Sequence, residues 1–465
     1  MRKNVYLAAV LGLGIVMLAG CGGSGSGSGM QGAEGTAAAG AGTAGKDADT
    51  DKRVPAGGEK SSAGEETGAA EKGTGEKVTV KVLQFKTELS EQMNAMAADY
   101  MKENPDVDLQ IESVISSDYD TVLKTRFASG EAPDIFNNEG YNKMTLWLDN
   151  LEDLSDQPWI ADMLDFTKEG ITTDGKIYGM PLYLESYGFL YNKDYFEQAG
   201  IAEIPVTLTA LKEAVKKLEA AGIPAFSVNG AEWYPNGVFF ANVPMAQQEN
   251  PTDFIRQLNE GTATFTDNKL YQDWIGLVEL QRDHAESDPM SVDFSTVVSD
   301  FANGKAAMIL GTNGYQPMVD EVNPELNTGL MPMPINDDAA LNDKIYAAAS
   351  TYWCVNKKSE SKEAAKEFLN WLVTSETGKN YVTKEFGFIP GLKSVKADEN
   401  AVGLLGVDTQ KYIDAGKIAG WEWPKYPDGA TVELGGAIQK FYAKEIDGPA
   451  ILDSFQVSWD DMKNN

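Results

Sequence analysis

A long segment of small residues confines folding to the part of the chain that follows it. From Gly22 to Lys77 the sequence is mainly Gly, Ala, Ser and Thr with scattered charges, and it has almost no side chains that could form a core. Such a composition stays disordered because it cannot bury enough apolar surface to offset the loss of chain entropy. We therefore expect a folded body only from about Val78 onward, which at this length is large enough for two lobes.

A short leader precedes that segment. Two basic residues come before an apolar run from Val5 to Leu18, which is too short to span a bilayer comfortably and ends in small residues. This pattern predicts a secretory signal peptide over residues 1–20. The residues Leu18-Ala19-Gly20-Cys21 resemble the lipobox of bacterial lipoproteins, in which the cysteine carries lipid; an ordinary signal peptide with a chance cysteine is the alternative. The lipobox interpretation predicts that Cys21 is lipidated and that residues 21–77 tether the folded body to the outer face of the cell membrane.

Charge and residue usage exclude several classes of function. The net charge is −31, and nearly all of it falls after the tether, so the surface repels nucleic acid and anionic lipid. The chain has one histidine, His284, in a charged segment, which argues against a Ser-His-Asp triad and against histidine metal clusters. With Cys21 lipidated, only Cys354 is left, so the folded part has no intramolecular disulfide. We predict no nucleic-acid partner, no cofactor and no metal site.

Strand and helix patterns alternate at the start of the folded part. Valines in alternation, helical spacing of apolar residues and buried runs predict, in order, a strand, a helix, a strand, a helix and a strand over residues 78–84, 89–103, 107–111, 119–127 and 133–136. This order predicts a parallel sheet, and ligands bind beyond the carboxyl ends of such strands. The loops at Phe85–Glu88, Ser116–Tyr119 and Asn137–Tyr141 should therefore meet at one rim.

The patterns further along the chain predict additional helices and strands, which also fit an α/β fold. Thr207 is typical of an N-cap, Leu211, Val215 and Leu218 form a buried stripe after it, and Gly222 ends the helix. The segments 224–228 and 306–310 are typical of buried strands, and Ala437–Trp459 predicts two helices.

One segment resembles a known family. The residues from Gly175 to Asp194, which contain Gly179-Met180-Pro181-Leu182-Tyr183 and Glu185-Ser186-Tyr187-Gly188, resemble the crossover segment of bacterial extracellular solute-binding proteins of family 1, the maltose-binding-protein-like sugar receptors of ABC importers. Further blocks in the order of that family are Ala132–Ile135, Pro205–Phe226, Phe301–Met308, Met331–Pro334, Phe368–Leu372 and Gly387–Pro390. The resemblance spans essentially all of Val78 to Trp459.

The resemblance implies two interwoven α/β lobes joined by a hinge, with the solute in a cleft between them, as in type II periplasmic binding proteins. It implies that lobe one comprises residues 78–183 and 305–345, and that lobe two comprises 184–304 and 346–465. The crossovers are expected near Leu184–Leu190, Phe301–Gly311 and Ala347–Val355. It also implies the function: a monomeric, non-catalytic receptor that captures a sugar or oligosaccharide outside the cell and delivers it to the transmembrane subunits of an ABC permease.

Carbohydrate chemistry selects the candidate ligand-binding residues. Aromatic rings suit the C–H faces of a sugar, and carboxylates and amides accept its hydroxyl protons. Glu185 falls where the family places a sugar-contacting glutamate; the alternative is a carboxylate satisfied by the backbone. The other candidates come from rim loops, turns and crossovers, and they are Phe85, Asn138, Glu139, Trp233, Asn313, Tyr315, Trp353 and Trp423.

Several of these candidates have a structural alternative. Asn138 could cap the helix after it, Tyr315 could pack in the hinge, and Trp353 could belong to the core. The cluster Trp421, Trp423 and Tyr426 fits either a ligand subsite or a lid packed on lobe two.

Two other functions stay open. A secreted glycoside hydrolase needs two carboxylates about 5–10 Å apart, and Glu139 with Glu185 could form such a pair. A receptor for a non-sugar solute, such as a peptide or a polyamine, would also suit an acidic rim. The loops show mostly carboxylates and amides rather than a basic cluster, so a neutral polyol fits better than an anion.

Overall fold

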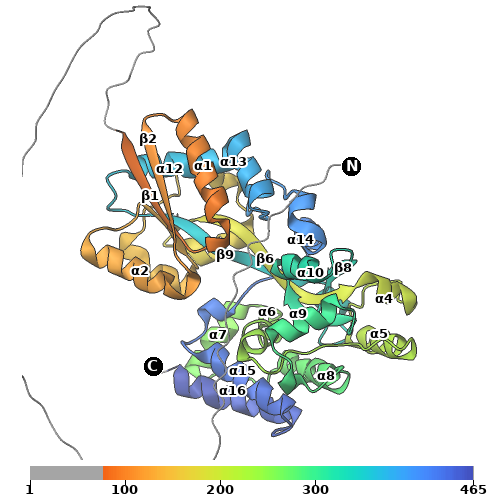
Figure 1. The fold of residues 1–465 in the computed structure, drawn as a ribbon. Coiled ribbons are helices and arrows are strands. Elements are labelled where there is room, and N and C mark those ends of the chain that lie inside the picture. The colour runs from red at the N-terminus through yellow and green to blue at the C-terminus, as the bar shows by residue number, and fades with distance from the viewer. Residues whose placement is uncertain (1–76, 464–465) are drawn as a thin grey trace, which may run out of the picture. The chain divides into compact units, whose positions relative to one another are not determined.

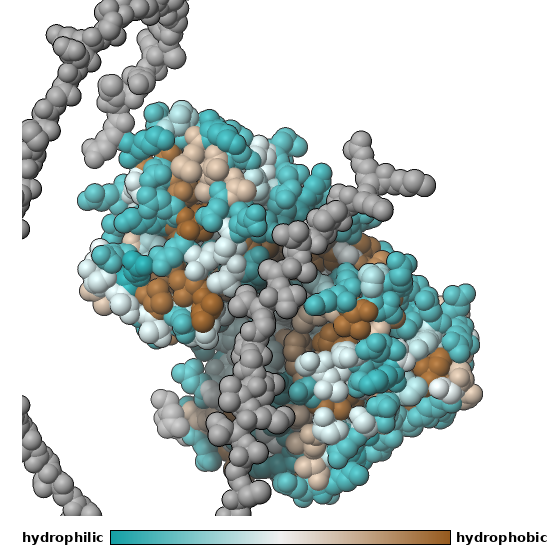
Figure 2. All heavy atoms as spheres, in the orientation of Figure 1, coloured by the Kyte–Doolittle hydropathy of each residue, from teal (hydrophilic) through white to brown (hydrophobic). Residues whose placement is uncertain are grey.

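A computed structural model describes residues 77–463. The predicted signal peptide, Cys21 and the tether up to residue 76 lie outside the described residues. Across residues 77–463, no helix has both the length and the apolar character needed to cross a bilayer. Figure 2 shows hydrophilic side chains over most of the visible face of this part, with apolar side chains in small separate patches.

One mixed sheet runs through the described part of the chain. Its strands, in spatial order, are β2 (Val107–Ser113), β1 (Val78–Gln84), β3 (Ile135–Asn138), β9 (Ile345–Val355), β6 (Met180–Asn192) and β7 (Met308–Thr312), while β8 (Thr328–Met331) pairs with β6 and β10 (Ile418–Ala419) with β9. The first three strands are parallel, as the alternating pattern predicted, because helices α1 (Ser90–Glu103) and α2 (Ser116–Ser129) connect them as crossovers. The pairs of β3 with β9, and of β6 with β9, β7 and β8, are antiparallel.

Apolar residues gather into separate cores on either side of the β6–β9 pair. The first core contains residues from Val80 to Leu184 and from Ala349 to Val395. The second core contains residues from Tyr187 to Tyr346 and from Trp421 to Trp459, with a smaller cluster around Ile309 and Leu330 beside it. We call the parts built on these cores the first lobe and the second lobe (Figure 1).

Helices cover both lobes. The first lobe carries α1 and α2 with α3 (Tyr141–Trp147), α12 (Lys362–Thr374) and α13 (Glu376–Asn380). The longer helices of the second lobe are α5 (Leu208–Ala220), α7 (Pro251–Glu260), α8 (Lys269–Asp283), α9 (Phe294–Ala302), α15 (Ala430–Tyr442) and α16 (Gly448–Met462). In α5, the Thr207 side chain accepts a hydrogen bond from Ala210 N, and Leu211, Val215 and Leu218 are buried, as predicted. The two predicted C-terminal helices are α15 and α16.

The division between the lobes differs from the one that the resemblance implied. Residues 305–345 were expected in lobe one, but β7 and β8 pair with the carboxyl-terminal half of β6 and pack in the second lobe. Residues 346–465 were expected in lobe two, but 349–395 pack in the first lobe, because β9 pairs with β3 and α12 covers that sheet. The segment Phe301–Gly311 therefore does not cross between the lobes.

Two long strands connect the lobes. β6 enters from the first lobe, pairs with β9 at Leu184–Ala349 and Tyr187–Tyr346, and continues into the second lobe. The register of this pair shifts near Tyr183, at the boundary between the two cores. The short strand β10, paired with Ile345 and Tyr346, carries the chain back to the second lobe. A ligand that lies against this boundary can contact both lobes at once.

The segment 224–228, predicted as a strand, makes only isolated bridges through Phe226 to Ala285 and Met308. Its backbone still bonds to β7, since Met308 N donates to Ala225 O over 2.9 Å. The segment is thus an extended stretch between β7 and residues 284–286, and it leads into the loop at Asn229.

Candidate functional site

Two adjoining cavities lie where the lobes meet. The first, of about 690 Å³, is lined by second-lobe residues and Glu185, and we call it the second-lobe cavity. The other, of about 610 Å³, is lined by both lobes, and we call it the interlobe cavity. The residues that line both are Glu185, Trp233, Tyr234, Phe239 and Thr312. The two spaces therefore share a wall, and an elongated ligand could occupy both.

Glu185 lies at the crossing point of the fold. It belongs to β6 and pairs with Ala348 of β9, one residue beyond the first-lobe core. Burial raises the pKa of the Glu185 carboxyl above its ordinary value, whereas the nearby Lys86 ammonium acts to lower it. The carboxyl group thus opens into the cavities while protein atoms keep most water away. In such surroundings a hydrogen bond to a ligand hydroxyl is stronger than in water.

The second lobe supplies an aromatic wall. Its members are Trp233, Tyr234, Phe239, Trp421, Trp423 and Tyr426. The rings of Trp421 and Trp423 stack with centroids 4.6 Å apart, and Phe239 contacts Trp423 edge-on at 5.8 Å. Trp233 and Tyr234 stand at the front of this wall, 36% and 51% exposed, where a ligand can reach them.

The aromatic wall is fixed from behind by two close backbone approaches. Pro235–Phe240 forms a turn of π-helix that packs on α15. A Cβ atom on Gly435 would collide with the carbonyl oxygen of Trp233, and one on Gly237 would collide with the carbonyl oxygen of Thr431. The absence of side chains at these two glycines sets how deeply Trp233 sits.

The first lobe supplies a polar wall to the interlobe cavity. Its members are Lys86, Ser116, Glu139, Asn142 and Lys143. Lys143 Nζ lies 3.4 Å from Glu139 Oε1 and 2.7 Å from Asp120 Oδ2. Lys86 Nζ lies 3.7 Å from Glu88 Oε1, so each charged side chain of this wall has a counter-charge within the first lobe.

Six of the nine residues predicted from the sequence line these cavities. They are Phe85, Glu139, Glu185, Trp233, Tyr315 and Trp423. Tyr315 lies at the back of the second-lobe cavity, where it packs edge-on against Phe294 at 5.1 Å.

The other three predicted residues lie outside the lining, because each has a structural task. Asn138 is buried and its Oδ1 accepts from Gly140 N, so it shapes the turn before α3. Asn313 Oδ1 accepts from Ser186 N over 2.8 Å and holds the middle of β6. Trp353 is fully buried in the first-lobe core, 5.9 Å from Phe368. For Trp353 the structural alternative describes the position, whereas Asn138 bonds to Gly140 N in the turn and not to an N–H group of α3.

The sequence did not point to several lining residues. Phe239 comes from the π-helical turn, and a local insertion of this kind leaves no pattern in the sequence. Gln439 reaches the second-lobe cavity from α15 and also donates to Gly230 O over 3.0 Å. Helical spacing could have placed Gln439 on one face of a helix, but it could not have shown that this face borders the second-lobe cavity.

The cavities bring together several kinds of polar group and aromatic rings. Within residues 77–463, no three or more His, Cys, Asp or Glu side chains come together in a way that could hold a metal ion. The linings of the two cavities combine flat rings, amides, hydroxyls, carboxylates and the ammonium groups of Lys86 and Lys143.

Comparison with known proteins identifies relatives across most of the chain. Residues 86–379 match the family described as bacterial extracellular solute-binding protein. The multiple sugar-binding protein of Streptococcus mutans is 22% identical over 333 residues, which cover 70% of this chain and 78% of that protein. The melibiose/raffinose/stachyose-binding protein MelE of Bacillus subtilis is 26% identical over 318 residues, covering 65% and 71% of the two chains.

Solved structures share the fold. RafE from Streptococcus pneumoniae in its apo form has a TM-score of 0.73 at 19% identity, covering 84% of this chain and all of that one. RafE in complex with raffinose has a TM-score of 0.66 at 20% identity, covering 83% of this chain and all of that one. The described chain thus has the α/β fold of these two RafE structures.

Proposed function

This chain belongs to the bacterial extracellular solute-binding protein family, and from that premise we propose that it captures a neutral oligosaccharide in the two adjoining cavities and passes it to an ABC permease. The observation that carries the proposal is the shared lining of the two cavities. A carboxylate, Glu185, and exposed rings, Trp233 and Tyr234, face the same space.

This combination matches the chemistry of a sugar. Each pyranose ring has an apolar face that an aromatic ring can cover, and hydroxyl groups that donate to carboxylates and amides. Two relatives carry names that state sugar binding, and RafE has been solved with raffinose. These names support a neutral oligosaccharide over the peptide or polyamine that the acidic surface could also attract.

Capture couples to movement of the lobes. The polar wall and the aromatic wall belong to different lobes, so a ligand contacts both only when the lobes close on it. A ligand with this preference shifts the population toward the closed form. The β6–β9 pair, with its register shift at the boundary, is the natural hinge.

We propose binding without hydrolysis. The other carboxylate considered for catalysis, Glu139, is ion-paired with Lys143 and sits on the first-lobe side of the cavity. Carboxylates in a binding cleft can act as hydrogen-bond acceptors alone, so the presence of Glu139 and Glu185 in the lining does not by itself call for hydrolysis.

The remaining parts of the proposal concern location and partners. We propose that Cys21 is lipidated, that the mature protein is a monomer held at the outer face of the membrane, and that the partner is a pair of transmembrane permease subunits. Mass spectrometry of the protein from its native membrane tests the anchor: a diacylglyceryl mass on an N-terminal cysteine is expected, and an unmodified or uncleaved N-terminus would overturn it.

Calorimetry tests the ligand. The purified folded part is titrated with raffinose, stachyose, melibiose and maltotriose, with spermidine and a tripeptide as the alternatives. We expect saturable binding of at least one oligosaccharide, which chromatography recovers intact after incubation. Binding of spermidine or the tripeptide alone, or release of shorter sugars, would replace the proposal with one of its rivals.

A further inference from the structure

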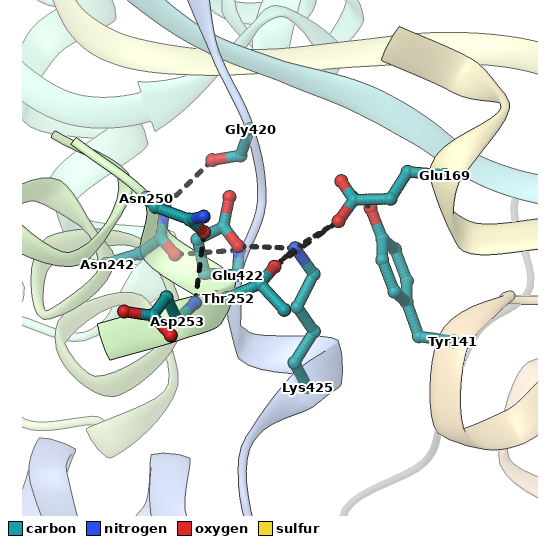
Figure 3. Close-up of polar contacts among 9 residues, drawn as sticks. All are labelled: Tyr141, Glu169, Asn242, Asn250, Thr252, Asp253, Gly420, Glu422 and Lys425. Atoms are coloured by element: carbon teal, nitrogen blue, oxygen red, sulfur yellow. Dashed lines mark hydrogen bonds and ion pairs between the residues drawn. The ribbon is translucent and has the colours of Figure 1, made fainter. Parts of the chain in front are cut away.

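A lysine of the second lobe bonds to a glutamate of the first lobe beside the interlobe cavity. Lys425 Nζ lies 2.8 Å from Glu169 Oε1, 2.7 Å from Glu422 Oε2 and 2.9 Å from Thr252 Oγ1 (Figure 3). Glu169 begins the short helix Glu169–Ile171, which packs in the first-lobe core through Ile171. The other three residues belong to the second lobe, so one ammonium group joins the two lobes.

The second-lobe side of this contact is rigidly held. Asn242 Oδ1 accepts from Glu422 N over 2.9 Å, and its Nδ2 donates to Gly420 O over 3.1 Å. The N-cap of α7, Asn250, accepts from Asp253 N and thereby fixes the first turn, which contains Thr252. The side chain of Lys425 is only 12% exposed. The second-lobe partners Glu422 and Thr252 therefore hold the ammonium group at a position from which it also reaches the first lobe.

The first-lobe side adds an aromatic ring. Lys425 Nζ lies 5.1 Å from the ring centroid of Tyr141, within the range of a cation–π contact. The Tyr141 hydroxyl donates to Glu169 Oε2 over 3.4 Å, and Tyr141 has a φ of 50°, in the left-handed region. A tyrosine rarely adopts this φ, and here its ring packs against Gly170, where a Cβ atom would come within 2.8 Å of the ring. The packing against Gly170 thus holds the Tyr141 ring where it contacts both Lys425 and Glu169.

This cluster borders the interlobe cavity but does not line it. The chain neighbours Gly140 and Asn142 line the cavity from the first lobe, and Pro424 and Tyr426 line it from the second. Asn142 Nδ2 also donates to Tyr426 O over 3.5 Å. The bonds between the lobes therefore form at the edge of the interlobe cavity. They do not involve Glu139 or Glu185, the carboxylates that face the space for the ligand.

We propose that Lys425 and Glu169 form an interlobe latch, which raises the population of the closed form and so raises ligand affinity without touching the ligand. The proposal deepens the proposed function and rests on it for the ligand. The contact with Glu169 exists only while the lobes are together. On opening, Glu169 returns to water, and Lys425 keeps Glu422 and Thr252 as partners.

The arrangement makes the latch reversible. Glu169 is 57% exposed, so it is readily solvated when released, and the buried Glu422 prevents Lys425 from being left without a counter-charge. Apparent affinity scales with the fraction of molecules in the binding-competent form. A weak bond between the lobes is therefore enough to change affinity severalfold while still letting the ligand leave.

The test is Glu169→Gln, which removes the charge but keeps the size of the side chain. Distances between spin labels on the two lobes, measured without ligand, should shift toward the longer, open population. Oligosaccharide affinity should fall by about threefold to tenfold, chiefly through faster dissociation, and should depend less on salt. The melting temperature should change little, because Glu169 is not needed in either core.

Asp165→Asn is the matched control. It removes the same charge four residues earlier, and Asp165 pairs with Lys168 at 2.9 Å and Lys393 at 3.4 Å, both in the first lobe. We expect the parental distances and affinity. If Glu169→Gln and Asp165→Asn give the same interlobe distances and the same oligosaccharide affinity, while the parent protein binds sugar, the latch proposal is wrong and the proposed function stands. If the parent binds no oligosaccharide, the proposed function fails, and the ligand-free distances still decide the latch.

Discussion

The two walls of the interlobe cavity differ in chemistry and in how they are held. The aromatic wall is a packed layer, in which Trp421 stacks on Trp423 and Trp423 lies 5.9 Å from Tyr187 of β6. The polar wall consists of longer side chains such as Glu139 and Lys143, whose exposed fractions are 54% and 40%. A packed ring loses little freedom when a ligand arrives, whereas a mobile charged side chain loses more. We therefore expect the second lobe to supply most of the binding free energy and the first lobe to complete enclosure.

Trp233→Ala breaks the aromatic wall at its front and should have the largest effect. Loss of a ring stacked on a sugar should weaken binding by about 1–3 kcal/mol, or roughly 5-fold to 150-fold. Isothermal titration with the best ligand measures the change. Leu146→Ala, which trims a 77% exposed side chain on α3, is the control and should bind like the parent. An unchanged dissociation constant for the Trp233 variant, with native melting behaviour, would remove that ring from the site.

Glu185→Gln probes the floor that both walls share. Replacing a charged acceptor by an amide should weaken binding by about 1 kcal/mol. The same substitution should raise the free energy of unfolding at neutral pH. Because burial raises the pKa of Glu185 in the folded state, its ionisation reduces the unfolding free energy as pH rises from about 4.5 through that raised value.

Glutamine does not ionise, so the Glu185 variant should melt at a higher temperature than the parent at pH 7, and the difference should shrink toward pH 4. Thermal unfolding at several pH values measures this trend. A variant that melts well below the parent at pH 7 would mean that the Glu185 carboxylate stabilises the fold rather than serving the ligand.

Glu139→Gln tests the polar wall and should have the smallest effect. The side chain is exposed and already paired with Lys143, so its loss should change the binding free energy by less than about 1 kcal/mol. The same titration measures it. If Glu139→Gln weakened binding as much as Trp233→Ala, the aromatic wall would not supply more binding free energy than the polar wall.

Local patterns in the sequence predicted the elements of the first lobe well. Alternating valines from Val78 and the helical spacing that follows them determine β1, α1 and β2, because side-chain period and local propensity act over a few residues. The N-cap at Thr207 is equally local. The two-lobed fold class itself came from the resemblance rather than from any single pattern.

The wrong predictions concern features that depend on packing between distant segments of the chain. The assignment of residues 305–345 to the first lobe was wrong because the pairing of β7 and β8 with β6 joins segments more than 100 residues apart. Asn138 is the last residue of β3, at the rim where a ligand-binding residue could also lie, but its side chain bonds to Gly140 N in the turn. The local sequence does not distinguish these two roles. Trp233 and Glu185 do line the cavities. Trp233 was a candidate because a large aromatic in a polar loop is unusual, whereas Glu185 was a candidate through its position in the resemblance.

The contact between Gly435 and the Trp233 carbonyl has a consequence for how this receptor could acquire a new ligand preference. The position of the foremost ring depends on helix α15, whose Gly435 lies against the carbonyl oxygen of Trp233 and lines neither cavity. A larger residue at Gly435 would therefore move the ring of Trp233, and so change the room for a sugar, without replacing a group that meets the sugar. Divergence of specificity among such chains can arise in the helix that supports the ring rather than in the ring.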